Sequence, residues 1–163
     1  AKAEMGPVCG VAQVETVMKY IECGKKEGAR LLTGGNRISG RDFEDGCFIE
    51  PTIFAEVKPA MKIAQEEIFG PVLSIIQVES MDEAIAISNN TKFGLTSSIF
   101  TNDLKQAMKF VEQTEVGLTH VNLMTSFKSF RIILRSCSFQ RVRTNNQWAG
   151  RECNTFPTAQ SRS

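Results

Sequence analysis

Short apolar runs alternate with helix-like segments along the middle of the chain, and this alternation limits the possible folds more than any other feature. Residues 72–78 are almost continuously apolar, as in a strand covered on both faces, and they predict the centre of a sheet. Residues 97–100 and 118–123 predict two further strands. The order strand, helix, strand, helix, strand predicts an α/β fold with a parallel sheet and right-handed crossovers.

Two helices are predicted between these strands. Ser80 and Glu83 form a capping box, from which a helix should run to about residue 89. Thr101 or Asn102 can cap the second helix. Its predicted buried stripe consists of four apolar residues: Leu104, Ala107, Met108 and Val111.

The first part of the chain predicts a helix followed by strands. Apolar residues recur at helical spacing from about residue 11 to residue 27, and Gly28 is placed to end the helix. Residues 30–33 predict a short strand. Residues 47–57 predict one strand, or two strands separated by Pro51.

The segment 65–72, Gln-Glu-Glu-Ile-Phe-Gly-Pro-Val, combines a carboxylate and an aromatic ring before a Gly-Pro turn. On extended backbone Glu67 and Phe69 point to one side. A carboxylate can accept hydrogen bonds from a ribose diol, and a ring can pack on the attached base. Gly70 would allow the chain to approach a ligand closely, and Pro71 would fix the bend. On pattern alone the better interpretation is a pair of solvated glutamates at a turn, because exposed carboxylates are the norm.

Glycine-rich phosphate loops are not found in this sequence. Residues 34–41 contain three glycines but lack the Lys-Ser/Thr pair of a P-loop, and no G-x-G-x-x-G occurs. If a dinucleotide binds, we expect its pyrophosphate to be held by residues outside this chain.

Four blocks resemble the aldehyde dehydrogenase superfamily, in the order and with the gaps of that family. Residues 65–72 resemble its EEIFGPV signature, and residues 46–52 its G-x-F-x-x-P-T segment. Residues 89–95 resemble NNT-x-(Y/F)-GL, and residues 117–122 resemble G-x-(V/T)-x-VN. The resemblance covers about residues 6–126. It implies an incomplete parallel-sheet αβα segment of an aldehyde dehydrogenase catalytic domain over residues 1–126.

The resemblance also implies roles for individual residues. Glu67 matches the position that contacts the nicotinamide ribose, and Phe69 the position that contacts the nicotinamide ring, with NAD or NADP as the cofactor. Gly70 and Pro71 would support this site structurally. Asn122 matches an asparagine that ties down the backbone beneath the catalytic cysteine.

The family oxidises an aldehyde to a carboxylic acid through a cysteine thiohemiacetal, and it needs a cysteine nucleophile and a glutamate base. Its F-x-x-x-G-Q-x-C context is absent here, and neither Cys9 nor the only histidine, His120, has a catalytic setting. No catalytic residue is therefore assigned, and the isolated chain is predicted to be inactive. An aldehyde substrate and a homo-oligomer are implied for a full-length parent. The alternative is a non-catalytic truncated product that associates with full-length subunits.

Composition changes where the resemblance ends. Residues 1–126 hold 12 basic and 17 acidic side chains, whereas residues 127–163 hold 7 basic side chains and one acidic side chain. We therefore predict that residues 127–163 are an atypical basic tail, disordered for most of its length. Arginines interleave with aromatic residues there, as in some nucleic-acid-binding segments, but no RNA-binding motif supports this and no nucleic-acid partner is expected.

The remaining composition excludes several classes. Five cysteines without C-x-x-C spacing and with one histidine argue against zinc and against a disulfide framework, so no metal site is expected. No apolar run reaches the roughly 20 residues of a membrane span, and no membrane partner is expected. A location in the cytosol or an organelle is expected. The start at Ala1, inside a family-like segment, suggests a fragment.

Overall fold

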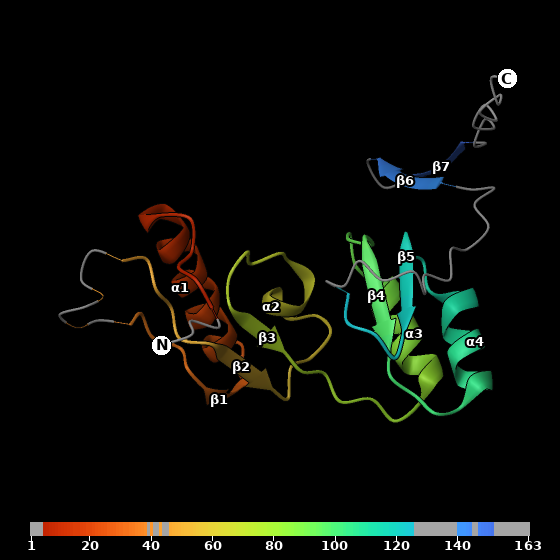
Figure 1. Cartoon of the computed structure of the whole chain (residues 1–163), viewed down its shortest axis with the longest axis horizontal. Coiled ribbons are helices and arrows are strands. Elements are labelled where there is room, and N and C mark those ends of the chain that lie inside the picture. The colour runs from red at the N-terminus through yellow and green to blue at the C-terminus, as the bar shows by residue number, and fades with distance from the viewer. Residues whose placement is uncertain are drawn as a thin grey trace, which may run out of the picture. The chain divides into compact units, whose positions relative to one another are not determined.

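The computed structural model describes residues 5–38, 40, 43, 46–125, 140–144 and 147–151, the last two ranges by their backbone. The chain divides into two compact units, Ala1–Glu79 and Ser80–Ser163. Figure 1 shows the elements of both units along the chain. Each unit is described separately below.

The first unit combines two helices with a three-stranded sheet. Its elements are α1 (Val11–Lys26), β1 (Arg30–Thr33), β2 (Thr52–Ala55), α2 (Lys62–Gln65) and β3 (Val72–Ser74). The strand order is β1-β2-β3, with β1 antiparallel to β2 and β2 parallel to β3.

Helix α1 ends in a Schellman motif one residue before the predicted end. Gly28 has φ of +90°, which favours glycine. Its amide donates to the Lys25 carbonyl at 3.2 Å, and the Ala29 amide donates to the Gly24 carbonyl at 3.0 Å. The prediction that Gly28 stops the helix is confirmed.

The core of the first unit lies between α1, the sheet and α2. Val17, Ile21 and Phe54 are fully buried at its centre. The other buried members come from α1, the isolated bridge, loops and α2: Val14, Ala29, Ile49, Val57, Met61, Ile63 and Ile68. Helix α1 therefore covers the sheet with the apolar stripe that its sequence predicted.

The strand predicted at the centre of the sheet lies at its edge. β3 comprises Val72–Ser74, and among the described strands it pairs with β2 alone, so the prediction of a central strand over residues 72–78 is wrong. Leu73 is 56% exposed, and Ile75 is also exposed. The central strand is β2, which begins directly after Pro51, so the two-strand alternative for residues 47–57 is the better one; upstream of Pro51, Ile49 makes an isolated bridge with Arg37.

The second unit contains a parallel strand pair joined by a helix. Its elements are α3 (Met81–Asn89), β4 (Thr96–Ile99), α4 (Leu104–Gln113), β5 (Leu118–Val121), β6 (Gln140–Thr144) and β7 (Gln147–Arg151). β4 and β5 pair in parallel, with Ser97 opposite Thr119. Buried Ile85 from α3, Ile99 from β4 and Phe110 from α4 pack together as the core. The predicted α/β class with parallel strand pairing is confirmed, although β1 adds an antiparallel strand.

The two helices of this unit start at side-chain caps. Ser80 accepts from the Glu83 amide at 3.2 Å, as the capping box predicted. Helix α4 is capped by Asp103 rather than by Thr101 or Asn102, because its carboxylate accepts from the Lys105 and Gln106 amides.

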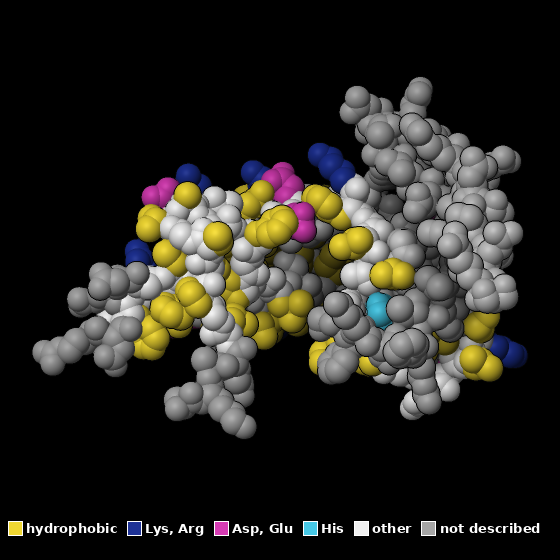
Figure 2. Space-filling view, turned by 45° about the horizontal axis from the view of Figure 1, so that its top comes forward, with side chains coloured by type: hydrophobic (Ala, Val, Ile, Leu, Met, Phe, Trp, Pro, Cys, Tyr) yellow, Lys and Arg dark blue, Asp and Glu magenta, His cyan; other side chains and the backbone are white. Residues whose placement is uncertain are grey.

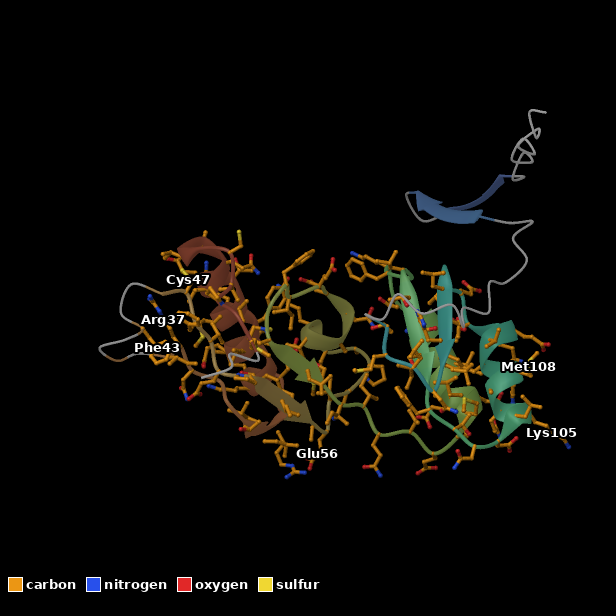
Figure 3. All side chains as sticks on the ribbon, in the orientation of Figure 1. Arg37, Phe43, Cys47, Glu56, Lys105 and Met108 are labelled. Atoms are coloured by element: carbon orange, nitrogen blue, oxygen red, sulfur yellow. The ribbon has the colours of Figure 1, made fainter. Side chains whose placement is uncertain are left out.

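The predicted apolar stripe of α4 is half right. Ala107 and Val111 are buried, together with Phe110. Leu104 is 75% exposed and Met108 is 42% exposed; Figure 3 labels Met108 on α4. Spacing alone could not choose between the two overlapping stripes, since both recur every three to four residues.

β6 and β7 form an antiparallel hairpin within residues 127–163. The remainder of that stretch lies outside the described residues, and its disorder stays a prediction. No helix among the described parts of the chain is long and apolar enough to span a membrane.

Candidate functional site

One face of α1 follows the segment that leads into the Gly-Pro turn. Gln13, Val17, Tyr20 and Gly24 lie three or four residues apart and therefore share this face. Gln13 contacts residues 68–69, Val17 lies against Gly70, Tyr20 binds Glu66, and Gly24 lies against Ile63. Helix α1 thus sets the course of the chain from α2 to β3.

The two adjacent glutamates have different surroundings. Glu66 accepts a hydrogen bond from the Tyr20 hydroxyl at 2.7 Å, and its carboxylate lies 3.8 Å from the Lys62 ammonium. Glu67 is exposed, while Ile68, the next residue, is buried. Exposed and buried side chains alternate over residues 67–69, and the Glu67 carboxylate is available to solvent.

Phe69 has an unusual backbone conformation. Its φ is +54°, in the left-handed region that bulky residues rarely adopt, and its side chain is 74% exposed. Such a conformation costs on the order of 1–2 kcal/mol and persists only where the surroundings impose it. The expectation of extended backbone through Phe69 is therefore wrong at this residue.

Gly70 is required by α1. A Cβ atom at Gly70 would lie 2.5 Å from Val17 Cγ2, which is closer than packed carbon atoms approach. The structure thus gives one reason for this glycine, its close approach to α1, and the predicted close approach to a ligand stays a prediction. Pro71 lies at the centre of a γ-turn, since the Val72 amide donates to the Gly70 carbonyl at 2.8 Å, and β3 starts at the next residue.

An open depression of about 360 Å³ lies beside Phe69. Phe69, Gly70 and Pro71 line it together with Ile49 and with the stretch 5–8 before α1. The Val8 amide donates to the Cys47 carbonyl at 2.8 Å, so this stretch is held against the segment that precedes β2. Cys47 is labelled in Figure 3. The depression gives the exposed ring a neighbouring apolar surface on which a flat group could lie.

Asn122 links the ends of β4 and β5 in the second unit. Its Oδ1 accepts from the Thr101 amide and its Nδ2 donates to the Thr101 carbonyl, both at 2.9 Å. The Asn122 amide itself donates to the Ile99 carbonyl at 2.8 Å. The side chain therefore acts as one more peptide group at the end of the parallel ladder. Asn122 has φ of +54°, which asparagine tolerates better than most residues.

His120 is 3% exposed, and its Nδ1 has no hydrogen-bond partner among the described residues. It lies on β5, within the strand predicted over residues 118–123. Cys9, Cys23 and Cys47 are free thiols. In the described ranges no three His, Cys, Asp or Glu side chains gather as a metal site would require.

The sequence interpretation missed Gln13 and Tyr20. Both lie on the stripe of α1 that also carries Val17, at spacings of four and three residues. A polar side chain in a buried helical stripe is a signal that needs an explanation, and this signal could have identified both residues.

The parallel strand pairs and their connecting helices place the chain among α/β proteins. The profile described as "Aldehyde dehydrogenase family" matches residues 1–131. The chain belongs to this family.

Relatives and solved structures agree with this assignment. The α-ketoglutaric semialdehyde dehydrogenase of Bacillus subtilis is 43% identical over 118 residues, covering 72% of this chain and 24% of the relative. The α-ketoglutarate semialdehyde dehydrogenase of Haloferax volcanii is 42% identical over 123 residues, which cover 76% of this chain and 26% of the relative. The chain thus spans about a quarter of the length of these relatives.

The fold also matches about a quarter of the length of solved crystal structures. The Mycobacterium tuberculosis aldehyde dehydrogenase complexed with NAD+ has a TM-score of 0.71 and 44% identity, covering 75% of this chain and 25% of that chain. The betaine aldehyde dehydrogenase of Staphylococcus aureus in complex with NAD+ has a TM-score of 0.75 and 33% identity, and the match covers 78% of this chain and 25% of that chain.

Proposed function

We propose that this chain is part of an NAD(P)-dependent aldehyde dehydrogenase, in which Glu67 binds the nicotinamide ribose and Phe69 packs on the nicotinamide ring. The observation that carries the proposal is the pair of exposed side chains on a segment fixed by α1. The solved M. tuberculosis and S. aureus relatives, both described with NAD+, support the choice of cofactor.

The residues present fit such a ligand. Glu67 is exposed, so its oxygens are free to accept from two vicinal hydroxyls. The Phe69 ring is exposed beside an apolar depression, as a stacking surface must be. A bound nicotinamide would accept hydride from the substrate. The chain's own contribution is to hold the ribose and the ring in position.

The isolated chain is proposed to be inactive towards aldehydes, because the cysteine nucleophile and the glutamate base of the family lie outside it. In a parent enzyme it would form one wall of the catalytic domain, with an aldehyde as substrate and homo-oligomeric assembly. Asn122, whose side chain binds the backbone of Thr101, would tie down the backbone beneath the catalytic cysteine of the parent enzyme. An assay of aldehyde-dependent NADH formation checks the inactivity, and turnover by the 163-residue chain would contradict it.

The ribose contact is tested by titrating the chain with nicotinamide mononucleotide and following amide chemical shifts by NMR. Glu67→Gln should weaken binding roughly tenfold or more, since hydrogen bonds to a charged group contribute about 1.5–3 kcal/mol. Nicotinamide without ribose should bind the unmodified chain and the variant equally.

Glu66→Gln is the matched control, because it makes the same substitution on the adjacent residue, whose carboxylate binds Tyr20. It should leave nucleotide affinity unchanged. Equal weakening by both substitutions, or none by Glu67→Gln, would overturn the assignment of the ribose contact.

A further inference from the structure

We propose that Gln13 is a positioning residue that holds Phe69 in its left-handed conformation and thereby fixes the direction of the Phe69 ring. What this ring binds rests on the proposed function, whereas the backbone clamp, meaning the two hydrogen bonds from Gln13 that hold Phe69, stands on the contacts of Gln13 alone.

Gln13 reaches two successive carbonyl groups with one amide. Its Nε2 donates to the Ile68 carbonyl and to the Phe69 carbonyl, each at 3.0 Å. A side-chain amide nitrogen carries two hydrogens, so both bonds can form at once. The two acceptors lie more than 50 residues further along the chain, and the contact therefore joins α1 to the segment before β3.

The double contact depends on the backbone of Phe69. In an extended strand successive carbonyls point to opposite sides, and a single donor cannot reach both. A residue with φ of +54° between them turns the two groups towards one side. The left-handed conformation and the two hydrogen bonds from Gln13 therefore require each other.

Neighbouring contacts fix the rest of the segment but do not bind these carbonyls. Val17 excludes any side chain at residue 70, and Tyr20 holds Glu66. These contacts lie on either side of Phe69. Without Gln13, Phe69 could return to an extended conformation that phenylalanine prefers, and the ring would turn relative to the depression that it lines.

The test replaces the amide of Gln13 while keeping its length. Gln13→Met removes both donors, and Gln13→Glu retains the shape but offers only acceptors to two carbonyl oxygens. Thr16→Val is the matched control, because Thr16 lies one turn along α1 and its hydroxyl bonds only to the helix carbonyl of Ala12. All variants are made in the 163-residue chain.

The first measurement is the NMR three-bond coupling between the amide and α protons of Phe69, together with the Cα chemical shift of this residue. Both Gln13 variants should move these values from left-handed to extended, while Thr16→Val leaves them unchanged. The titration of Tyr20 reports whether α1 still packs on the segment, and it should be the same in every variant. If the coupling and the Cα shift of Phe69 still indicate a left-handed conformation in either folded Gln13 variant, the proposal that Gln13 holds this conformation is overturned.

The second measurement is the affinity for nicotinamide mononucleotide. Gln13→Met should lower the affinity about three- to tenfold with little change in the melting temperature, because release of the strain at Phe69 offsets the loss of the two hydrogen bonds. A purely structural role would instead lower the melting temperature. Unchanged affinity with a displaced Phe69 backbone would overturn the positioning role. If the unmodified chain binds no nucleotide, the proposed function fails, and the Phe69 coupling still decides the clamp.

Discussion

At the scale of single residues, the hydrogen bond between Tyr20 and Glu66 ties α1 to the segment before β3. The hydrogen bond to the Glu66 carboxylate raises the pKa of the Tyr20 phenol above its usual value of 10, and burial and the negative charge of Glu66 act in the same direction. The protonated phenol is the donor, so the folded state favours the protonated form. This contribution to stability is fully present below pH 10 and is lost as the pH rises through the folded pKa.

The chain contains one tyrosine, which makes this pKa directly measurable. Absorbance at 295 nm should show ionisation of Tyr20 above pH 10 in the folded chain. Glu66→Gln should lower the pKa towards 10, because the acceptor loses its charge. Glu67→Gln serves as the control and should leave the titration unchanged. A Tyr20 pKa that stays raised in Glu66→Gln would show that the negative charge of Glu66 is not its main cause.

At the scale of elements, two asparagine side chains connect secondary structure in the second unit. Asn89, at the end of α3, donates to the Gln113 carbonyl and accepts from the Glu115 amide, each at 2.8 Å. Asn122 makes the equivalent pair of bonds with Thr101. A carboxamide has the donor and acceptor of a peptide group, so each asparagine satisfies backbone groups where a helix or strand has ended.

Asn122→Ala should destabilise the second unit by roughly 1–3 kcal/mol, because two hydrogen bonds are lost and alanine is strained at a φ of +54°. Urea unfolding measures this loss, and hydrogen exchange at the Thr101 amide should become faster. Asn102→Ala removes an exposed asparagine from the same connection and should change neither quantity. Equal effects of both substitutions would show that Asn122 makes no special contribution.

At the scale of the whole molecule, each unit has its own apolar core, and much apolar surface remains exposed. Figure 2 shows hydrophobic side chains on the visible face. The exposed ones include Leu73 and Ile75 in the first unit and Phe93, Leu95, Phe100 and Leu104 in the second. The chain spans about a quarter of its relatives' length. In the stretch 72–78, which was predicted to be covered on both faces, Leu73 and Ile75 are exposed.

The core of the first unit is formed entirely by residues between Val8 and Ile76. We therefore expect a peptide of residues 1–79 to keep its helical circular dichroism and the raised pKa of Tyr20. The second unit contributes no tyrosine, so the absorbance at 295 nm reports on the first unit in both molecules. A Tyr20 pKa of 10 in the shortened peptide would show that the first unit requires the second.

Local features of the fold could be predicted from the sequence. The end of α1 at Gly28 and the start of α3 at Ser80 depend on groups within one helical turn, and both predictions are confirmed. The α/β class followed from the alternation of short apolar runs, which predict strands, with segments of helical spacing. Glu67 and Phe69 were selected by resemblance to the family, and their roles stay predictions.

The amino-acid sequence by itself determined where helices begin and end and which family the chain resembles, because these depend on neighbouring residues and on motifs. Tertiary structure alone decided that β2 is central, that Gly70 makes room for Val17, and that Gln13 binds the carbonyls beside Phe69. The physical reason is that these contacts join segments far apart along the chain. Periodicity shows which side of an element is apolar, but it does not identify the residues that the side will meet.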